Sequence, residues 1–359
     1  MVHSLAYANN YGLKRLSRRY SQSLLAAMLF GCVANALLPS KSAADENGIS
    51  FWIPGQFGSF AAVPAKPGWA FATIYYHTSV NAGGAVAAAR EVSIGQVPHT
   101  ANVNLNVNMD ARADLQLLVP TYTFQTPVLG GQFALSMAGS IGYNSNVSVD
   151  GTLTTPFGTR QGSITDSRGG FSDLYPMATI KWHDGVNNYM TYVTGDVPVG
   201  TYDAMRLANF GIGHAAIDGG VGYTYADLKS GREFSAVTGL TYNFKNSDTD
   251  YQSGIDWHLD WGLSQFLSKQ VHIGAVGYFY QQLTSDSGAP AILGDTKSRV
   301  IGAGPQIGYL FPVGEDLHGY LNLKGYYEFD STYRPKGWNT WLTLSISPAP
   351  PSSAAAHGR

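Results

Sequence analysis

The stretch NVNLNVNMD, residues 102–110, alternates polar and apolar side chains at every position. Successive side chains of a β-strand point to opposite faces, whereas a helix would scatter these residues around its circumference. The stretch therefore predicts a strand with one apolar and one polar face. We expect the apolar face to meet lipid and the polar face to meet an enclosed axis. The apolar face consists of Val103, Leu105, Val107 and Met109, and the polar face of Asn102, Asn104, Asn106, Asn108 and Asp110.

The same period of two recurs along most of the chain. At 255–261 large apolar residues alternate with Asp and His, and at 320–329 leucines and aromatic residues alternate with Asn, Lys and Glu. Breaks rich in Gly, Asp and Asn separate such stretches, as expected of turns. The pattern predicts about 12–14 strands. Their ranges are 68–79, 101–110, 113–124, 132–144, 173–183, 187–197, 217–227, 233–245, 252–262, 270–282, 297–311, 318–330 and 338–347, with 85–94 as a fourteenth.

Composition places these strands in a membrane. Soluble domains usually carry roughly 25% charged residues and about 7% Gly, whereas this chain of 359 residues has 13% charged residues and 42 Gly. A membrane helix needs about 18 consecutive apolar residues, and no stretch after Leu38 provides them. A soluble β-sandwich would alternate too. The polar faces rich in Asn, Asp and Tyr, and the aromatic residues near predicted turns, favour an all-β, transmembrane, antiparallel β-barrel. These aromatic residues include Trp182, Tyr189, Trp338 and Trp341.

The N-terminus reads as a secretory signal peptide at residues 1–44. A basic cluster at 14–19 precedes an apolar run at 24–38 and small residues at 42–44, which is the order of such signals. Removal of five basic side chains from 22 leaves 17 against 24 acidic ones, a net charge of −7. Nucleic acid is an unsuitable partner for such a chain. Export and a barrel together predict the outer membrane of a Gram-negative cell.

The next segment, residues 45–67, does not alternate. It contains large apolar residues among Gly and Pro, and their free exposure to water would be costly. We therefore expect a hatch segment that enters the lumen of the barrel or lies on its rim. The barrel is expected at 68–347 and a Pro- and Ala-rich tail at 348–359. The apolar residues of this hatch segment, which would form the ligand path, are Phe51, Trp52, Ile53, Phe57 and Phe60.

A second group of candidate residues is polar and faces the expected lumen. Asp256, His258 and Asp260 share one strand face, spaced about 7 Å apart because a strand rises near 3.4 Å per residue. Three groups so spaced do not ligate one metal ion by themselves. We expect a hydrated lumen network, with no metal and no cofactor, and the sequence leaves open whether it rigidifies the barrel or lines a substrate path. The full set is Asp256, His258, Asp260, Arg299, Lys324 and Glu328.

Several segments resemble a known family. They are ENGISFWIPGQFGSF at 46–60, YQSGIDWHLDWGLSQFLS at 251–268, YFYQQLTSDSG at 278–288, RVIGAGPQIGYLF at 299–311, YLNLKGYYEFD at 320–330 and RPKGWNTWLTLSIS at 334–347. Together they are similar to the outer-membrane family named for the meta-pathway of phenol degradation. That family includes sphingosine-responsive members and is distantly related to the long-chain fatty-acid channel. The resemblance implies a barrel with an N-terminal hatch that admits hydrophobic or aromatic compounds. The tail at 348–359 departs from barrels that end on an aromatic strand residue.

These observations predict a monomeric outer-membrane channel. It would take up small hydrophobic or aromatic compounds, or lipid-like amphiphiles, by passive diffusion. Its other partner would be the lipid of the outer membrane, and it would not be an enzyme. One alternative is a general porin or a structural barrel without a specific ligand. A barrel-borne lipid hydrolase that uses His258 is a further alternative, although the chain has neither a Gly-x-Ser-x-Gly elbow nor a His-Glu-x-x-His pair.

Overall fold

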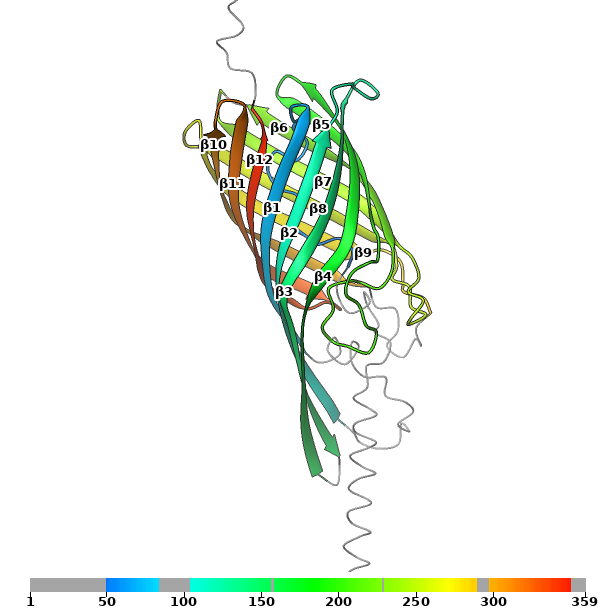
Figure 1. The fold of residues 1–359 in the computed structure, drawn as a ribbon. Helices are drawn as coiled ribbons and strands as arrows, with labels where there is room; N and C mark the ends of the chain where they lie inside the picture. Colours follow the sequence, from blue (N-terminus) through cyan, green and yellow to red (C-terminus); the bar gives the residue numbers. More distant parts are fainter. Residues whose placement is uncertain (1–49, 84–103, 156–157, 228, 289–296, 350–359) are drawn as a thin grey trace, which may run out of the picture.

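The computed structural model describes residues 50–83, 104–155, 158–227, 229–288 and 297–349. Twelve strands form one closed barrel in which every neighbouring pair is antiparallel and β1 closes the sheet against β12 (Figure 1). The predicted all-β barrel is therefore confirmed. The strands are β1 Gly68–Gly83, β2 Asn104–Thr123, β3 Gln132–Thr155, β4 Gly158–Asp184, β5 Asn187–Asp196, β6 Ala216–Asp227, β7 Arg232–Asn243, β8 Asp256–Phe266, β9 Val271–Gln282, β10 Arg299–Val313, β11 Leu317–Thr332 and β12 Lys336–Pro348.

The count of twelve lies within the predicted 12–14, but two of the predicted strands are one. The stretches 101–110 and 113–124 were expected as two strands, but the described residues from Asn104 to Thr123 form the single strand β2. Ala111 and Arg112 form no turn, because β2 pairs without interruption with β1 at these positions. The stretch 85–94 and residues 350–359 of the tail lie outside the described residues. Among the described residues, no helix is long and apolar enough to cross a membrane.

The two ends of the barrel differ in their connections. At one end the strands are joined by the short segments 124–131, 185–186, 228–231, 267–270 and 314–316. β1 begins and β12 ends at this short-turn end. The opposite, long-loop end carries longer connections such as 197–215 and 244–255. Several large aromatic side chains near the short-turn end point outward, and Trp69 and Tyr122 contact each other there with ring centroids 5.1 Å apart.

Most strands place apolar side chains outside and polar ones inside. On β11, Leu323 and Tyr327 are exposed on the outer wall, while Lys324 and Glu328 are buried in the lumen. The burial pattern of β8 alternates in the same way and buries Asp256, as predicted. Trp341 is an exception to the expected aromatic belt. It points inward and packs on Tyr76 across the closing strand pair, with ring centroids 4.5 Å apart.

The opposite polarity occurs where β2, β3 and β4 extend past the other strands at the long-loop end (Figure 1). Here Met109 is 1% exposed and packs inside against Val147, whereas Asp110 on the same strand is exposed. The expectation that Met109 faces lipid and Asp110 faces the lumen was therefore wrong. Strand parity fixes which residues share a face but does not say whether the outer medium is lipid or water. In this extension the polar face is the outer one and the apolar face lines the interior.

Candidate functional site

The described part of the hatch segment lies inside the barrel. Ser50 accepts a hydrogen bond from Arg334 at the long-loop end (3.2 Å), and Lys181 donates to the carbonyl of Val63 (3.4 Å). The segment thus runs through the lumen toward Gly68, where β1 begins at the short-turn end. Residues 50–67 contain turns and no strand, so their backbone groups need partners on the wall.

The five apolar residues predicted for the hatch segment contact aromatic groups of the wall. Phe51 lies 6.0 Å from Tyr175 and Phe57 lies 5.7 Å from Tyr192, measured between ring centroids. Trp52 stacks on His258, with ring centroids 3.5 Å apart, and Phe60 lies edge-on to His272 at 5.4 Å. Ile53 packs on the buried group that contains Tyr76, Tyr278 and Trp341.

Two charged side chains of the barrel wall bind the turn of the hatch segment at Gly55. The Asp260 carboxylate accepts hydrogen bonds from the backbone N–H groups of Gly55 (3.0 Å) and Phe57 (3.1 Å). Lys324 donates to the carbonyl of Gly55 at 2.7 Å. Gly55 has φ of +89°, and a Cβ there would lie 2.9 Å from the ring of Tyr326. Only glycine fits this turn, because the left-handed backbone and the close ring both exclude a side chain.

Side chains of the barrel wall also bind the hatch segment further along, at residues 59–62. Phe60 N–H donates to Glu233 and Ala62 N–H donates to Thr224, each at 3.0 Å. Gln306 donates to the hydroxyl of Ser59 at 2.7 Å. Glu233, Thr224 and Gln306 were not among the predicted site residues. The inward parity of their strands was the available signal, but parity does not reveal which inward groups meet the hatch segment.

His258 belongs to a buried network that its own strand does not reveal. Its Nε2 lies 2.9 Å from Asp218 of β6, and the two side chains are 1% and 0% exposed. Tyr192 of β5 donates to the same carboxylate at 2.7 Å. Asp256 instead accepts from Asn243 at 2.8 Å. The three groups predicted on β8 therefore have different partners: Asp256 has Asn243, His258 has Asp218, and Asp260 has the hatch segment.

Glu328 belongs to another buried network, near the long-loop end. Its two oxygens accept from Tyr278 OH (2.8 Å) and from the N–H of Gly337 (2.7 Å). Asn339 donates to Tyr278 OH at 3.0 Å. Arg299 lies apart from the other five predicted residues. It pairs with Asp330 at 3.0 Å, and both side chains are about 40% exposed. The next residue, Val300, is the one that is buried in the lumen, so the prediction that Arg299 faces the lumen was one position out of phase.

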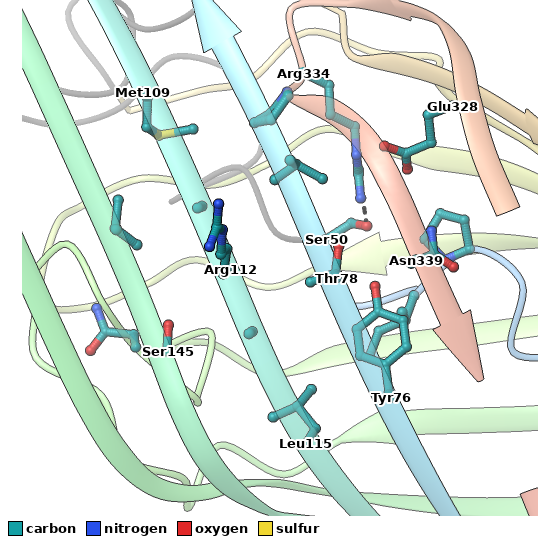
Figure 2. Close-up of a pocket in the computed structure, with 18 of the residues that line it drawn as sticks. Ser50, Tyr76, Thr78, Met109, Arg112, Leu115, Ser145, Glu328, Arg334 and Asn339 are labelled. Carbon is teal, nitrogen blue, oxygen red and sulfur yellow. Dashed lines mark hydrogen bonds between the residues drawn. The ribbon is translucent and has the colours of Figure 1, made fainter. Parts of the chain in front are cut away.

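A cavity of about 180 Å³ lies between the hatch segment and β1, β2 and β3. Figure 2 shows its two contrasting sides: Met109 and Leu115 on β2 at one side, and Arg334, Glu328, Asn339 and Ser50 at the other. Trp52, Ile53 and Pro54 of the hatch segment complete the lining. The β2 wall contributes mainly apolar side chains together with Arg112, the connection 197–215 contributes Arg206, and further polar groups lie where β11 and β12 meet. Among the described residues, no group of three His, Cys, Asp or Glu side chains is arranged to hold a metal ion.

The chain matches one family model and resembles several solved structures. The family model described as putative MetA-pathway of phenol degradation matches residues 89–344. No curated protein matches the chain. Among solved structures, an outer membrane channel from Pseudomonas putida F1 is 11% identical, with 82% of this chain and 100% of that chain covered and a TM-score of 0.59. A FadL homologue from Pseudomonas aeruginosa is 10% identical, with coverages of 87% and 99% and a TM-score of 0.38.

A further solved structure, the CymD monoaromatic hydrocarbon channel, is 9% identical, with coverages of 86% and 97% and a TM-score of 0.33. The likeness to the Pseudomonas putida channel shows a shared barrel fold. The two lower TM-scores are too small to carry an argument.

Proposed function

Because the chain belongs to the family described as putative MetA-pathway of phenol degradation, we propose that it is an outer-membrane channel for small apolar compounds, aromatic ones included. The observation that carries this proposal is the cavity, whose apolar side is made by β2 and β3 at a place where ordinary barrels have a polar lumen. Short turns of such barrels face the periplasm and long loops face outside. The cavity then opens on the outer side of the hatch segment.

The entry route follows from the reversed polarity of the extension. Leu207 and Ala208 of the connection 197–215 pack on Met109 and Val147. An apolar compound that passes this connection therefore meets Met109 and Val147, then Leu115, and finally Trp52 and Ile53. Each contact removes apolar surface from water, which is worth about 25 cal/mol per Å². Passage along this face needs no energy source, so we propose passive diffusion through a monomer, with the hatch segment as the barrier between the cavity and the periplasm.

The arrangement favours this function over the two alternatives. A general porin needs a water-filled lumen, whereas here wall side chains bind the hatch segment through at least four backbone N–H groups, those of Gly55, Phe57, Phe60 and Ala62. A hydrolase would need access to His258, whose ring is covered by Trp52 at 3.5 Å. We therefore propose that His258 has a structural role.

Filling the cavity tests the proposal. Leu115→Trp on the inner face of β2 should reduce uptake of a radiolabelled monoaromatic hydrocarbon by intact cells to the level of cells without the protein. Leu118→Trp is the matched control, because Leu118 lies on the same strand but is 50% exposed on the outer wall. Equal uptake by both variants would refute the cavity route.

Two further measurements address the alternatives. Deletion of residues 46–60 should change hydrophobic uptake, and unchanged uptake and ligand binding would refute a role for the hatch segment. Proteoliposomes that hold the full chain should not swell in sugar solutions, whereas a general porin would make them swell. A lipid hydrolase would instead show lipase activity that His258→Ala abolishes.

A further inference from the structure

We propose that Asp173 and Asp196 together bind one divalent cation, Ca²⁺, at the long-loop end of the barrel. The site lies where β4 and β5 meet the connection 197–215, which begins directly after Asp196. Neither carboxylate lines the cavity described above. The proposal therefore goes beyond the channel function and does not depend on it.

The register of the sheet brings the two carboxylates to the same inner face. Leu174 of β4 pairs with Val197, just past the end of β5. These two side chains are 39% and 42% exposed on the outer wall. Asp173 and Asp196 each precede one residue of that pair and point the other way, with exposures of 1% and 5%. Such diagonal neighbours lie about 7–8 Å apart, a gap that one cation bound to both carboxylates can span.

The connection 197–215 is folded around the Asp173 carboxylate. One oxygen accepts from the N–H of Gly200 at 2.6 Å, and the other accepts from the N–H of Ile212 at 2.8 Å. A Cβ on Gly211 would lie only 2.9 Å from the first oxygen, so the backbone passes too close for a side chain there. Because a carboxylate offers about four acceptor positions, each oxygen of Asp173 can still bind one further group.

Asp196 has no hydrogen-bond partner on either oxygen among the described residues. The charged group that acts on it is Asp173, which carries the same sign. A buried carboxylate without a partner is very costly, and such groups in proteins are paired or coordinate metal ions. Protonation would remove the charge of Asp196 but would leave both oxygens without partners. A bound cation removes the repulsion and uses the free oxygens at the same time.

Oxygen ligands from two carboxylates suit Ca²⁺. This ion takes about six to eight oxygen ligands at about 2.3–2.6 Å, and water or backbone carbonyls can supply several of them. No third His, Cys, Asp or Glu side chain of the described ranges completes the group, and a set of carboxylate, carbonyl and water oxygens favours Ca²⁺ over Zn²⁺. We expect a dissociation constant of about 0.1–1 mM, as in extracellular Ca²⁺ modules.

Calorimetric titration of the full chain in detergent with Ca²⁺ tests the site. His214 also acts electrostatically on Asp173, so the titration is done at pH 8, where an ordinary histidine is neutral. Asp196→Asn and Asp173→Asn should each weaken Ca²⁺ binding by at least about 10-fold, because each removes one of two charged ligands. Asp248→Asn, at an exposed position of the connection 244–255, should leave the affinity unchanged.

Tyr175 provides a signal that is local to the site. Its side chain interacts electrostatically with both carboxylates, so its ring is close enough to sensitise the luminescence of a Tb³⁺ ion bound between them. Ca²⁺ should displace this ion and quench the emission. Tyr175→Phe should remove most of the Ca²⁺-sensitive emission and leave the calorimetric affinity for Ca²⁺ unchanged, because the phenol is not a ligand.

Hydrogen exchange measures the effect of the ion on the connection. The amides of Gly200 and Ile212 donate to Asp173, so an ion that holds this carboxylate should also protect them. At a Ca²⁺ concentration ten times the dissociation constant, their exchange should slow by up to about 11-fold. The same addition should not slow exchange in Asp196→Asn.

Two results would overturn the proposal. One is exchange and Tb³⁺ emission that do not respond to Ca²⁺ in the unchanged protein. The other is an equal Ca²⁺ affinity in the unchanged protein and in Asp196→Asn, which would mean that the ion binds elsewhere. If Asp196→Asn does not fold, as judged by sheet dichroism, Asp173→Asn decides, because its amide oxygen can still accept from the connection. Uptake of hydrocarbons tests the channel proposal separately.

Discussion

The indole of Trp52 lies on the imidazole of His258, with ring centroids 3.5 Å apart and an interplanar angle of 14°. The same imidazole is 2.9 Å from Asp218. One residue of the hatch segment therefore covers a hydrogen-bonded His–Asp pair that the wall buries almost completely. Because buried polar groups are costly unless they are hydrogen-bonded, the position of the hatch segment and the stability of this network depend on each other.

The stack predicts that Trp52→Ala loosens the hatch segment. Truncation of a buried tryptophan costs about 3–5 kcal/mol, and the loss falls on contacts between the segment and the wall. We expect a higher single-channel ion conductance in planar bilayers. Trp69→Ala is the control, since Trp69 is 57% exposed on the outer wall and its loss should leave the conductance unchanged. Equal conductance in all three proteins would mean that the hydrogen bonds alone hold the segment.

Asp260 and Lys324 hold the same turn of the hatch segment from opposite sides, one through N–H groups and one through a carbonyl. Lys324→Met removes a charged hydrogen bond to the buried Gly55 carbonyl and should lower the free energy of unfolding by about 1.5–3 kcal/mol. In the Lys324→Met background, Asp260→Asn should lower the free energy of unfolding by less than it does in the unchanged protein. We expect a coupling energy of about 0.5–3 kcal/mol, because both substitutions remove parts of one contact. Urea unfolding in detergent micelles gives the three values.

The matched control for this cycle is the pair of Lys245 and Asp250, 2.8 Å apart, with side chains 54% and 67% exposed. Removal of an exposed pair should change the free energy of unfolding by about 0–1 kcal/mol. Strictly additive effects at Asp260 and Lys324 would show that each residue stabilises the barrel independently.

The reversed polarity of β2 predicts a boundary of the membrane along one strand. Asp110→Cys should react with a membrane-impermeant maleimide on intact cells, because its outer face meets water there. Leu118→Cys, with the same parity eight residues further along β2, should stay unlabelled in lipid. Labelling of both sites would mean that Leu118 lies outside the membrane. Labelling of neither site would mean that the extension lies in the bilayer.

The connection 197–215 is fixed to the extension of β4 by Asp166. This carboxylate accepts from the backbone N–H groups of Leu207 and Ala208, each at 3.1 Å, and from the Arg206 guanidinium. Asp166 lies in the part of β4 beyond the membrane, and the nearby guanidinium and N–H groups lower its pKa to about 2. Asp166→Asn should therefore speed hydrogen exchange of residues 206–208.

The sign of the pH dependence follows from this lowered pKa. The stabilisation is complete above the ordinary carboxyl pKa of about 4 and is lost as the pH falls toward 2. Once corrected for the intrinsic pH dependence of exchange, protection at residues 206–208 should be constant from about pH 5 to 8. Asp248→Asn, at an exposed position in the connection 244–255, should leave this protection unchanged. A loss of protection between pH 8 and 5 would contradict the assignment to Asp166.

Some features of the site were accessible from residue order and others were not. The large apolar residues between Phe51 and Phe60 indicated a hatch segment in the lumen or on the rim. The parity of β8 indicated that Asp256, His258 and Asp260 face inward. Their partners came from elsewhere: Asp218 is 40 positions away from His258, and Gly55 is 205 positions away from Asp260. A local period carries no information about which distant strand or loop faces a given side chain.

The sequence by itself determined the period of two, and its composition then favoured a closed sheet in a membrane, because an open sheet edge has no hydrogen-bond partners in lipid. It did not determine which medium each face meets. The alternation at 102–110 predicts a strand, which the described residues from Asn104 onward form, yet Met109 lies inside and Asp110 outside, because β2 extends beyond most other strands of the barrel. Register, strand length and the path of residues 50–67 through the lumen are long-range properties. Only the tertiary structure could bring Met109, Trp52 and Arg334 to one cavity, since their contacts depend on how the barrel closes.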